Sequence, residues 1–189
     1  GAALSAHMSG FTKLPSLLQR LCKWGLRRLV YEGRINKFLA AHGHRSNFDF
    51  IDNIFETLSF TYHIQHSDSQ AIPATGRMII VANHPLGALD GLALLQLVGS
   101  IRQDVKIIAN DILMQISPLS ALMLPVDTMG GETGRHDLSC IHAALENEQA
   151  VIVFPAGEVS RAGAKGIKDR KWNTGFLRFA ERTQAPLLP

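Results

Sequence analysis

The feature that most constrains the fold is a set of three short, mainly apolar runs, two of which stop at loops containing proline and glycine. Residues 77–82 (RMIIVA), 105–109 (VKIIA) and 151–154 (VIVF) are each too short for a buried helix and are rich in β-branched side chains. Apolar runs of this length are typical of strands buried on both faces of a parallel sheet. We therefore expect three strands here, and a fourth that begins within residues 186–189.

Helical periodicity fills the stretches between these runs. Apolar residues recur at three- and four-residue steps in residues 91–99 and 135–147, and a last helix is expected over 174–183. Asp90 stands just before the first of these helices and is expected to be its N-cap. The alternation of strands and helices predicts an α/β fold, with a mostly parallel sheet flanked by helices.

The first 70 residues have a different pattern, which predicts a helical segment with amphipathic helices over about 12–30 and 48–64. The first of these helices is rich in Lys and Arg and contains Trp24. That composition is typical of a helix lying in a membrane interface, and also of an ordinary surface helix packed on a core. We divide the chain into this N-terminal segment, residues 1–70, and a second domain, residues 71–189. Residues 1–7 resemble a cloning remnant, which would make Met8 the native start.

Composition places the chain among globular proteins and excludes several other classes. With 189 residues, 46% hydrophobic and 19% charged, it resembles neither a disordered nor a fibrous protein. Its two cysteines, Cys22 and Cys140, are too few for a disulfide framework. No run of about 18 apolar residues is present, so no membrane-spanning helix is expected.

The formal net charge of +3 is unevenly distributed. Residues 1–70 carry 8 Lys/Arg against 5 Asp/Glu, residues 71–150 carry 4 against 8, and residues 151–189 carry 7 against 3. Basic ends suit anionic lipid head groups, phosphates or nucleic acid. The cations are not interleaved with aromatic residues and no nucleic-acid-reading motif is visible, so a nucleic-acid partner is not expected.

Four histidines in the N-terminal segment could in principle bind a metal ion. They are His42, His44, His63 and His66. No cysteine or carboxylate cluster accompanies them at ligand spacing, so we interpret them as solvated side chains and expect no metal site.

One loop carries a candidate catalytic pair. Ligands of open parallel sheets gather at the carboxyl ends of the strands. His84 follows the 77–82 run after one intervening residue, and Asp90 lies six positions further on. A histidine with a carboxylate partner forms a general base, because the carboxylate fixes the tautomer and stabilises the imidazolium. The alternative is that Asp90 is only an N-cap and His84 only a loop residue.

A second loop follows the 151–154 run and carries candidate binding residues. Glu158, Ser160 and Arg161 lie at its end, and four further cations follow between residues 165 and 171. A guanidinium makes paired hydrogen bonds with phosphate or carboxylate, so Arg161 is the stronger candidate for an anionic substrate. The cations of 165–171 are equally well explained as a solvated loop.

Four segments, in order, resemble the conserved blocks of the glycerolipid (lysophospholipid) acyltransferase superfamily. They are VANHPLGALDG at 81–91, LPVD at 124–127, FPAGEVSR at 154–161 and APLLP at 185–189. The resemblance covers residues 72–189. It is greatest to a bacterial branch labelled putative hemolysins, some relatives of which acylate lyso-ornithine lipids.

The resemblance implies a reaction and a role for each of the candidate site residues. A fatty acyl group would pass from an acyl thioester, either acyl-CoA or acyl carrier protein, to the hydroxyl of a lysolipid or glycerol-phosphate-type acceptor. His84 would be the general base and Asp90 its partner, with direct attack on the thioester and no covalent acyl-enzyme, metal or cofactor. The residues implied in substrate binding are Asn83, Asp127, Glu158, Ser160 and Arg161.

The chain departs from the usual blocks of that superfamily in ways that bear on the acceptor. The His-to-Asp spacing is six positions instead of five, Ala156 stands where a glutamate is usual, and Val159 lengthens the gap to Arg161. These changes argue against glycerol 3-phosphate or lysophosphatidate and favour another lysolipid. The superfamily continues beyond its fourth block, so a chain ending at Pro189 suggests a truncated domain.

The same resemblance implies a peripheral protein on the cytoplasmic face of the inner membrane. The alternative is a membrane-associated lipid-binding protein that has lost turnover.

Overall fold

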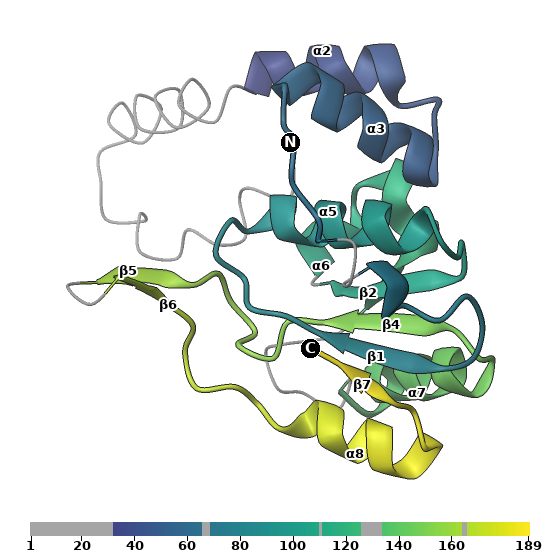
Figure 1. Ribbon diagram of the computed structural model, residues 1–189. Coiled ribbons are helices and arrows are strands. Elements are labelled where there is room, and N and C mark those ends of the chain that lie inside the picture. The colour runs from purple at the N-terminus through teal and green to yellow at the C-terminus, as the bar shows by residue number, and fades with distance from the viewer. Residues whose placement is uncertain (1–31, 66–68, 110, 126–133, 164–165) are drawn as a thin grey trace. The chain divides into compact units, whose positions relative to one another are not determined.

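The computed structural model describes residues 32–65, 69–109, 111–125, 134–163 and 166–189 (Figure 1). The chain divides into two compact units, residues 1–45 and 46–189, which we treat separately. The described part of the first unit holds helix α2 (Glu32–His42). The helix expected over residues 12–30 lies outside the described residues.

The second unit is built on a five-stranded sheet in which every pairing is parallel. The strand order is β3-β2-β4-β1-β7. The strands are β1 (Met78–Val81), β2 (Val105–Ala109), β3 (Met123–Pro125), β4 (Ala150–Val153) and β7 (Leu187–Leu188). All four side chains of the interior strand β1 are buried, which explains its uninterrupted apolar sequence. The predicted α/β fold with a mostly parallel sheet is confirmed.

Helices cover both faces of this sheet (Figure 1). Helix α5 (Ala88–Gly99) packs on β2 and β4, and α3 (Asn47–Leu58) packs on α5 and on the 3₁₀ helix η2 (Ser117–Leu122). The opposite face is covered by α7 (Gly134–Glu146) and α8 (Gly175–Thr183), which also contact each other. A short helix α6 (Asp111–Met114) follows β2.

The strand β4 is followed by a projecting antiparallel hairpin, which consists of β5 (Arg161–Gly163) and β6 (Gly166–Lys168) (Figure 1). The hairpin is separate from the main sheet. It leads into the segment before α8, so the loop after β4, the hairpin and α8 form one continuous path.

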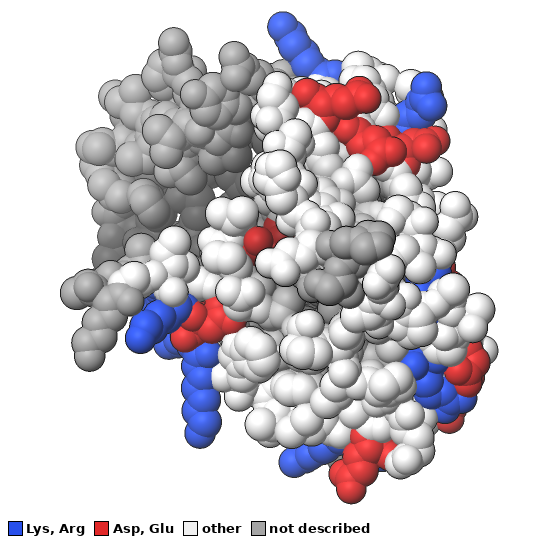
Figure 2. Space-filling view, viewed as in Figure 1, with Lys and Arg blue, Asp and Glu red and all other residues white. Residues whose placement is uncertain are grey.

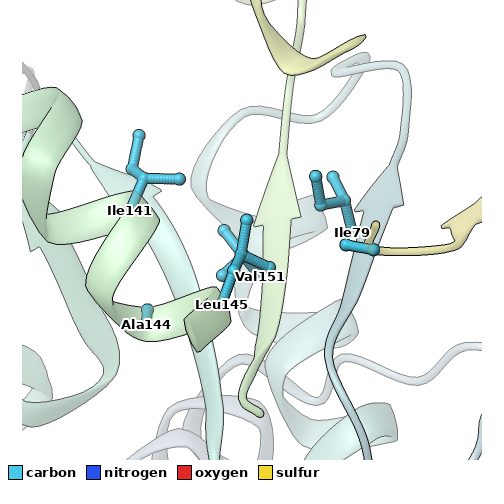
Figure 3. Close-up of a cluster of buried hydrophobic side chains, with 6 residues drawn as sticks. Ile79, Ile141, Ala144, Leu145 and Val151 are labelled. Atoms are coloured by element: carbon cyan, nitrogen blue, oxygen red, sulfur yellow. The ribbon is translucent and has the colours of Figure 1, made fainter. Parts of the chain in front are cut away.

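A cluster of buried side chains fixes the sheet against α7 (Figure 3). Ile79 of β1 and Val151 of β4 are register partners and meet Ile141 and Leu145 of α7. Each of these four side chains is at most 2% exposed. Burial of such a side chain contributes about 1.5–3 kcal/mol, so this cluster holds the two strands that carry the candidate site loops.

Buried Arg102 connects the segments that precede strands β1, β2 and β4, at the amino ends of these strands. Its guanidinium makes paired hydrogen bonds, both 2.7 Å long, with the carboxylate of Asp104. It also donates to the carbonyl oxygens of Pro73, Gly76 and Glu148. Three chain segments distant in sequence therefore share one buried cation.

Three expectations differ from the structure. Helix α3 packs on α5 and η2, so the compact unit with the sheet begins at Ser46, upstream of the expected boundary at 70/71. Helix α3 ends at Leu58 and not at 64, because Ser59 adopts a left-handed conformation with φ of 48°. Asp90 is not the N-cap of α5, which begins at Ala88, and Gly87 is the cap residue.

No helix in the described ranges is both long enough and apolar enough to cross a membrane.

Candidate active site

His84 and Asp90 lie together at the carboxyl end of β1. The His84 Nδ1 atom is 3.2 Å from Oδ2 of Asp90, and the two side chains are 17% and 14% exposed. The atoms are close but not aligned for a regular hydrogen bond, and Nδ1 has no hydrogen-bond partner of regular geometry among the described residues. The structure thus brings the expected pair together in a partly desolvated position, where charge interactions are stronger than in water.

The Asp90 carboxylate is oriented by the loop that precedes it. Oδ2 accepts a 2.7 Å hydrogen bond from the backbone N–H of Leu86. Asp90 also lies in the first turn of α5, where the helix dipole stabilises a negative charge. Gly87 has a φ of 68°, a conformation that costs glycine little, and this lets the loop turn sharply between His84 and Asp90.

The His84 imidazole stacks on the ring of Phe154. The ring centroids are 4.0 Å apart and the planes are inclined by 23°. Phe154 directly follows β4, the parallel neighbour of β1, so the carboxyl ends of two adjacent strands supply the histidine and the surface that orients it. The stacking covers one face of the imidazole ring.

The loop after β4 is joined to the His84 loop through the backbone. The N–H of Ser160 donates a 2.8 Å hydrogen bond to the carbonyl oxygen of His84. Gly157, with a φ of 68°, forms the turn before it. The FPAGEVSR segment therefore lies against the histidine loop.

Glu158 is paired with two arginines. Its Oε2 lies 2.9 Å from Arg161 and its Oε1 lies 2.9 Å from Arg170, and the side chains of these arginines are 66% and 63% exposed. The cluster has two cations for one carboxylate, so it retains a net positive charge facing solvent. An anionic group could bind there by accepting hydrogen bonds from the guanidinium groups.

Asp169 is a site residue that the sequence analysis did not identify. Its Oδ1 accepts hydrogen bonds from the backbone N–H of His84, at 3.3 Å, and from the Ser160 hydroxyl. Its Oδ2 accepts one from the indole N–H of Trp172, at 2.8 Å. The hydrogen bond from Ser160 is the main cause that lowers the pKa of Asp169 below the usual aspartate value. The sequence offered one indication of this role. Asp169 is the single acidic residue within the basic run 165–171, and it lies three positions before Trp172.

The predicted residues fall into three groups. His84, Asp90 and Ser160 are in contact or share hydrogen bonds, Glu158 lies on the same loop as Ser160, and Arg161 begins β5 directly after it. Asn83 is exposed and directly precedes His84. Asp127 lies outside the described residues. Within the described ranges no group of three or more His, Cys, Asp or Glu side chains is arranged to hold a metal ion.

The site and fold define a class of α/β protein with a histidine–carboxylate pair at the carboxyl edge of a parallel sheet. The family described as Acyltransferase matches residues 6–189, and the chain belongs to this family.

Two curated relatives are similar over most of the chain. The chain is 29% identical over 165 residues to the lyso-glycine lipid O-acyltransferase of Phocaeicola vulgatus, and 28% identical over 165 residues to that of Bacteroides thetaiotaomicron. Each alignment covers 87% of this chain, but only 58% and 60% of the respective relative. The chain thus spans about three fifths of the length of these relatives. No solved structure matches it.

Proposed function

We propose that this protein transfers a fatty acyl group from an acyl thioester to the hydroxyl of a lysolipid, with His84 as the general base. The observation that carries the proposal is the 3.2 Å approach of His84 Nδ1 to Asp90 at the carboxyl edge of the sheet, in a chain of the acyltransferase family. The names of the two relatives support the same class of reaction.

We propose a role for each ring nitrogen. Asp90 faces Nδ1, so the neutral ring would carry its proton there and Nε2 would accept the proton of the acceptor hydroxyl. The hydroxyl oxygen would attack the thioester carbonyl, and the carbon–sulfur bond would break as the new ester forms. The departing thiolate would take its proton from the imidazolium, which Asp90 stabilises meanwhile. Such base catalysis contributes about 10²–10⁴-fold to the rate.

We propose an acceptor with an anionic head group. Glu158 lies on the loop whose Ser160 is bonded to the His84 carbonyl, and it pairs with Arg161 at the start of β5 and with Arg170 after β6. An incoming carboxylate or phosphate would compete with Glu158 for these guanidinium groups. The relatives are named for lyso-glycine lipids, which favours an amino-acid-containing lysolipid over glycerol 3-phosphate. Asn83 and Asp127 remain candidates for acceptor binding.

We further propose that the protein works at the surface of an anionic membrane, as a peripheral protein on the cytoplasmic face of the inner membrane. Four large apolar side chains around the site loops are exposed: Leu86, Val159, Ile167 and Trp172. Residues 158–172 carry five Lys/Arg against two Asp/Glu, and basic side chains gather near the base of the hairpin in Figure 2. Exposed apolar groups beside cations favour binding to anionic lipid head groups.

The test is thiol release from a long-chain acyl thioester with a panel of lysolipids, using both coenzyme A and acyl carrier protein donors. The whole gene product that contains this chain is compared with His84→Ala and with His142→Ala. His142 is a matched control, because its Nδ1 also lies 3.2 Å from a carboxylate, that of Glu146, but on α7. We expect acceptor-dependent release that His84→Ala loses and His142→Ala retains.

The opposite result would favour another function. If no donor and acceptor pair supports release, while the protein still binds lysolipid vesicles, the better interpretation is a lipid-binding protein without turnover. Release that persists in His84→Ala would retain the acyltransferase but remove His84 from the role of base.

A further inference from the structure

We propose that Asp169 is a positioning residue that holds the His84 backbone in the orientation needed for proton transfer. This inference rests on the proposed function, because it concerns the same histidine. The inference adds to the proposed function that the orientation of His84 depends on Asp169, a residue 85 positions away along the chain.

Both polar backbone groups of His84 are held by the segment after β4. The N–H of His84 donates to Oδ1 of Asp169, and its carbonyl oxygen accepts from the N–H of Ser160. The Ser160 hydroxyl donates to the same Oδ1 atom. Asp169 therefore acts on His84 directly and also through Ser160, so its carboxylate links both sides of the histidine backbone.

Asp169 is itself held from the side away from His84. Its Oδ2 accepts the indole N–H of Trp172, and the Trp172 ring makes an edge contact with Phe176 of α8, with ring centroids 6.5 Å apart. The next residue, Asn173, donates its N–H to the carbonyl oxygen of Pro155 at 2.9 Å. A continuous set of contacts therefore runs from helix α8 to the histidine.

The carboxylate accepts three hydrogen bonds, and an ionised aspartate can accept all three because its two oxygens have about four lone-pair sites. These hydrogen bonds keep the pKa of Asp169 below its usual range, with that from the Ser160 hydroxyl the largest cause. Hydrogen bonds to an ionised group are about twice as strong as neutral ones. An asparagine of the same shape has only one acceptor oxygen, so it cannot satisfy donors on both sides.

A purely structural role for Asp169 makes a different prediction from a positioning role. A structural residue would change the amount of folded protein and leave the folded fraction equally active. A positioning residue would lower kcat in folded protein, because small displacements of a catalytic group are costly. A 1 Å misplacement reduces a rate by about 10²-fold.

The experiment compares Asp169→Asn with Asp104→Asn in the whole gene product. Asp104 is a matched control because its carboxylate is also bound to donors, those of Arg102, in the loop before β2 at the opposite end of the sheet. We expect Asp169→Asn to lower kcat by about 10–100-fold with KM changed less than about threefold. Asp104→Asn should leave kcat within about twofold while lowering the unfolding temperature.

A second measurement follows the loop itself by amide hydrogen exchange of residues 82–90. Asp169→Asn should accelerate exchange there, because the His84 N–H loses its acceptor or shares a weaker one. Trp172→Phe, which removes one donor to Asp169 and does not touch His84, should give a smaller change in the same direction. This variant keeps the test decisive if Asp169→Asn does not fold.

The outcomes separate this inference from the proposed function. An active parent protein whose Asp169→Asn variant retains its kcat and its exchange rates would overturn the role of Asp169 alone. A parent protein inactive with every donor and acceptor would overturn the proposed function, and the positioning role with it. Lower kcat together with faster exchange in the 82–90 loop, absent from Asp104→Asn, would support the inference.

Discussion

The backbone N–H of Ser160 donates a hydrogen bond to the carbonyl oxygen of His84 over 2.8 Å. This contact joins the loops that follow β1 and β4, two strands paired in parallel at the centre of the sheet. Because parallel neighbours end at the same edge, the candidate base and the basic loop proposed to bind the acceptor lie against each other. The predictions below test the parts of this arrangement separately.

Asp90→Asn should lower turnover by about 10²-fold or more, because the amide cannot stabilise the imidazolium of His84. The amide oxygen can still accept the Leu86 N–H, so the loop should keep its shape. Thiol release at saturating acceptor measures the effect. Unchanged kcat in Asp90→Asn would contradict the pairing of this carboxylate with the base.

Phe154→Leu should lower kcat by about 3–10-fold, because the stacked ring that orients the imidazole is replaced by a flexible side chain. Phe60→Leu serves as a control, since Phe60 follows α3 and packs on the Phe55 and Tyr62 rings. Steady-state kinetics of both variants provide the measurement. Equal losses of kcat in the two would point to a general packing defect.

Arg102→Met should destabilise the fold by about 2–4 kcal/mol, because three backbone carbonyl groups and the Asp104 carboxylate lose their donor. Arg77→Met is the comparison, since Arg77 pairs with the exposed carboxylate of Glu148 and donates to only one backbone carbonyl, that of Thr183, so its loss should cost less. Urea unfolding of both variants gives the free energies. A smaller loss for Arg102→Met than for Arg77→Met would contradict the structural role of Arg102.

Acid should weaken the fold partly through Asp104. Hydrogen bonds from Arg102 lower the pKa of Asp104 in the folded state, so the ionised carboxylate favours folding. This contribution is fully present above the ordinary aspartate pKa of about 3.9 and is lost as the pH falls through the lower folded value. The difference in urea midpoint between the protein and Asp104→Asn should therefore shrink below about pH 4. A constant difference from pH 7 to pH 3 would contradict this assignment.

Local sequence pattern determined the strands and the loops that carry chemistry. The expected strand over 105–109 coincides with β2, and β1 and β4 lie within one residue of their expected positions at each end. These elements are predictable because strands in the interior of a parallel sheet are mainly apolar along their length, with Lys106 of β2 as the exception, and that pattern is a property of the sequence alone. The placement of His84 just after β1, with Asp90 at the start of the following helix, could be expected from the same pattern.

Only the tertiary structure decided how these residues meet. The start of α5 at Ala88 turned the expected N-cap Asp90 into a first-turn residue facing His84, because Gly87 takes the cap position. The compact unit includes α3, because its apolar face packs on α5, a contact that no local pattern specifies. Asp169 reaches His84 across 85 residues through the hairpin after β4. A hydrogen bond between such distant segments depends on the packing of the sheet and helices, so no spacing in the sequence could predict it.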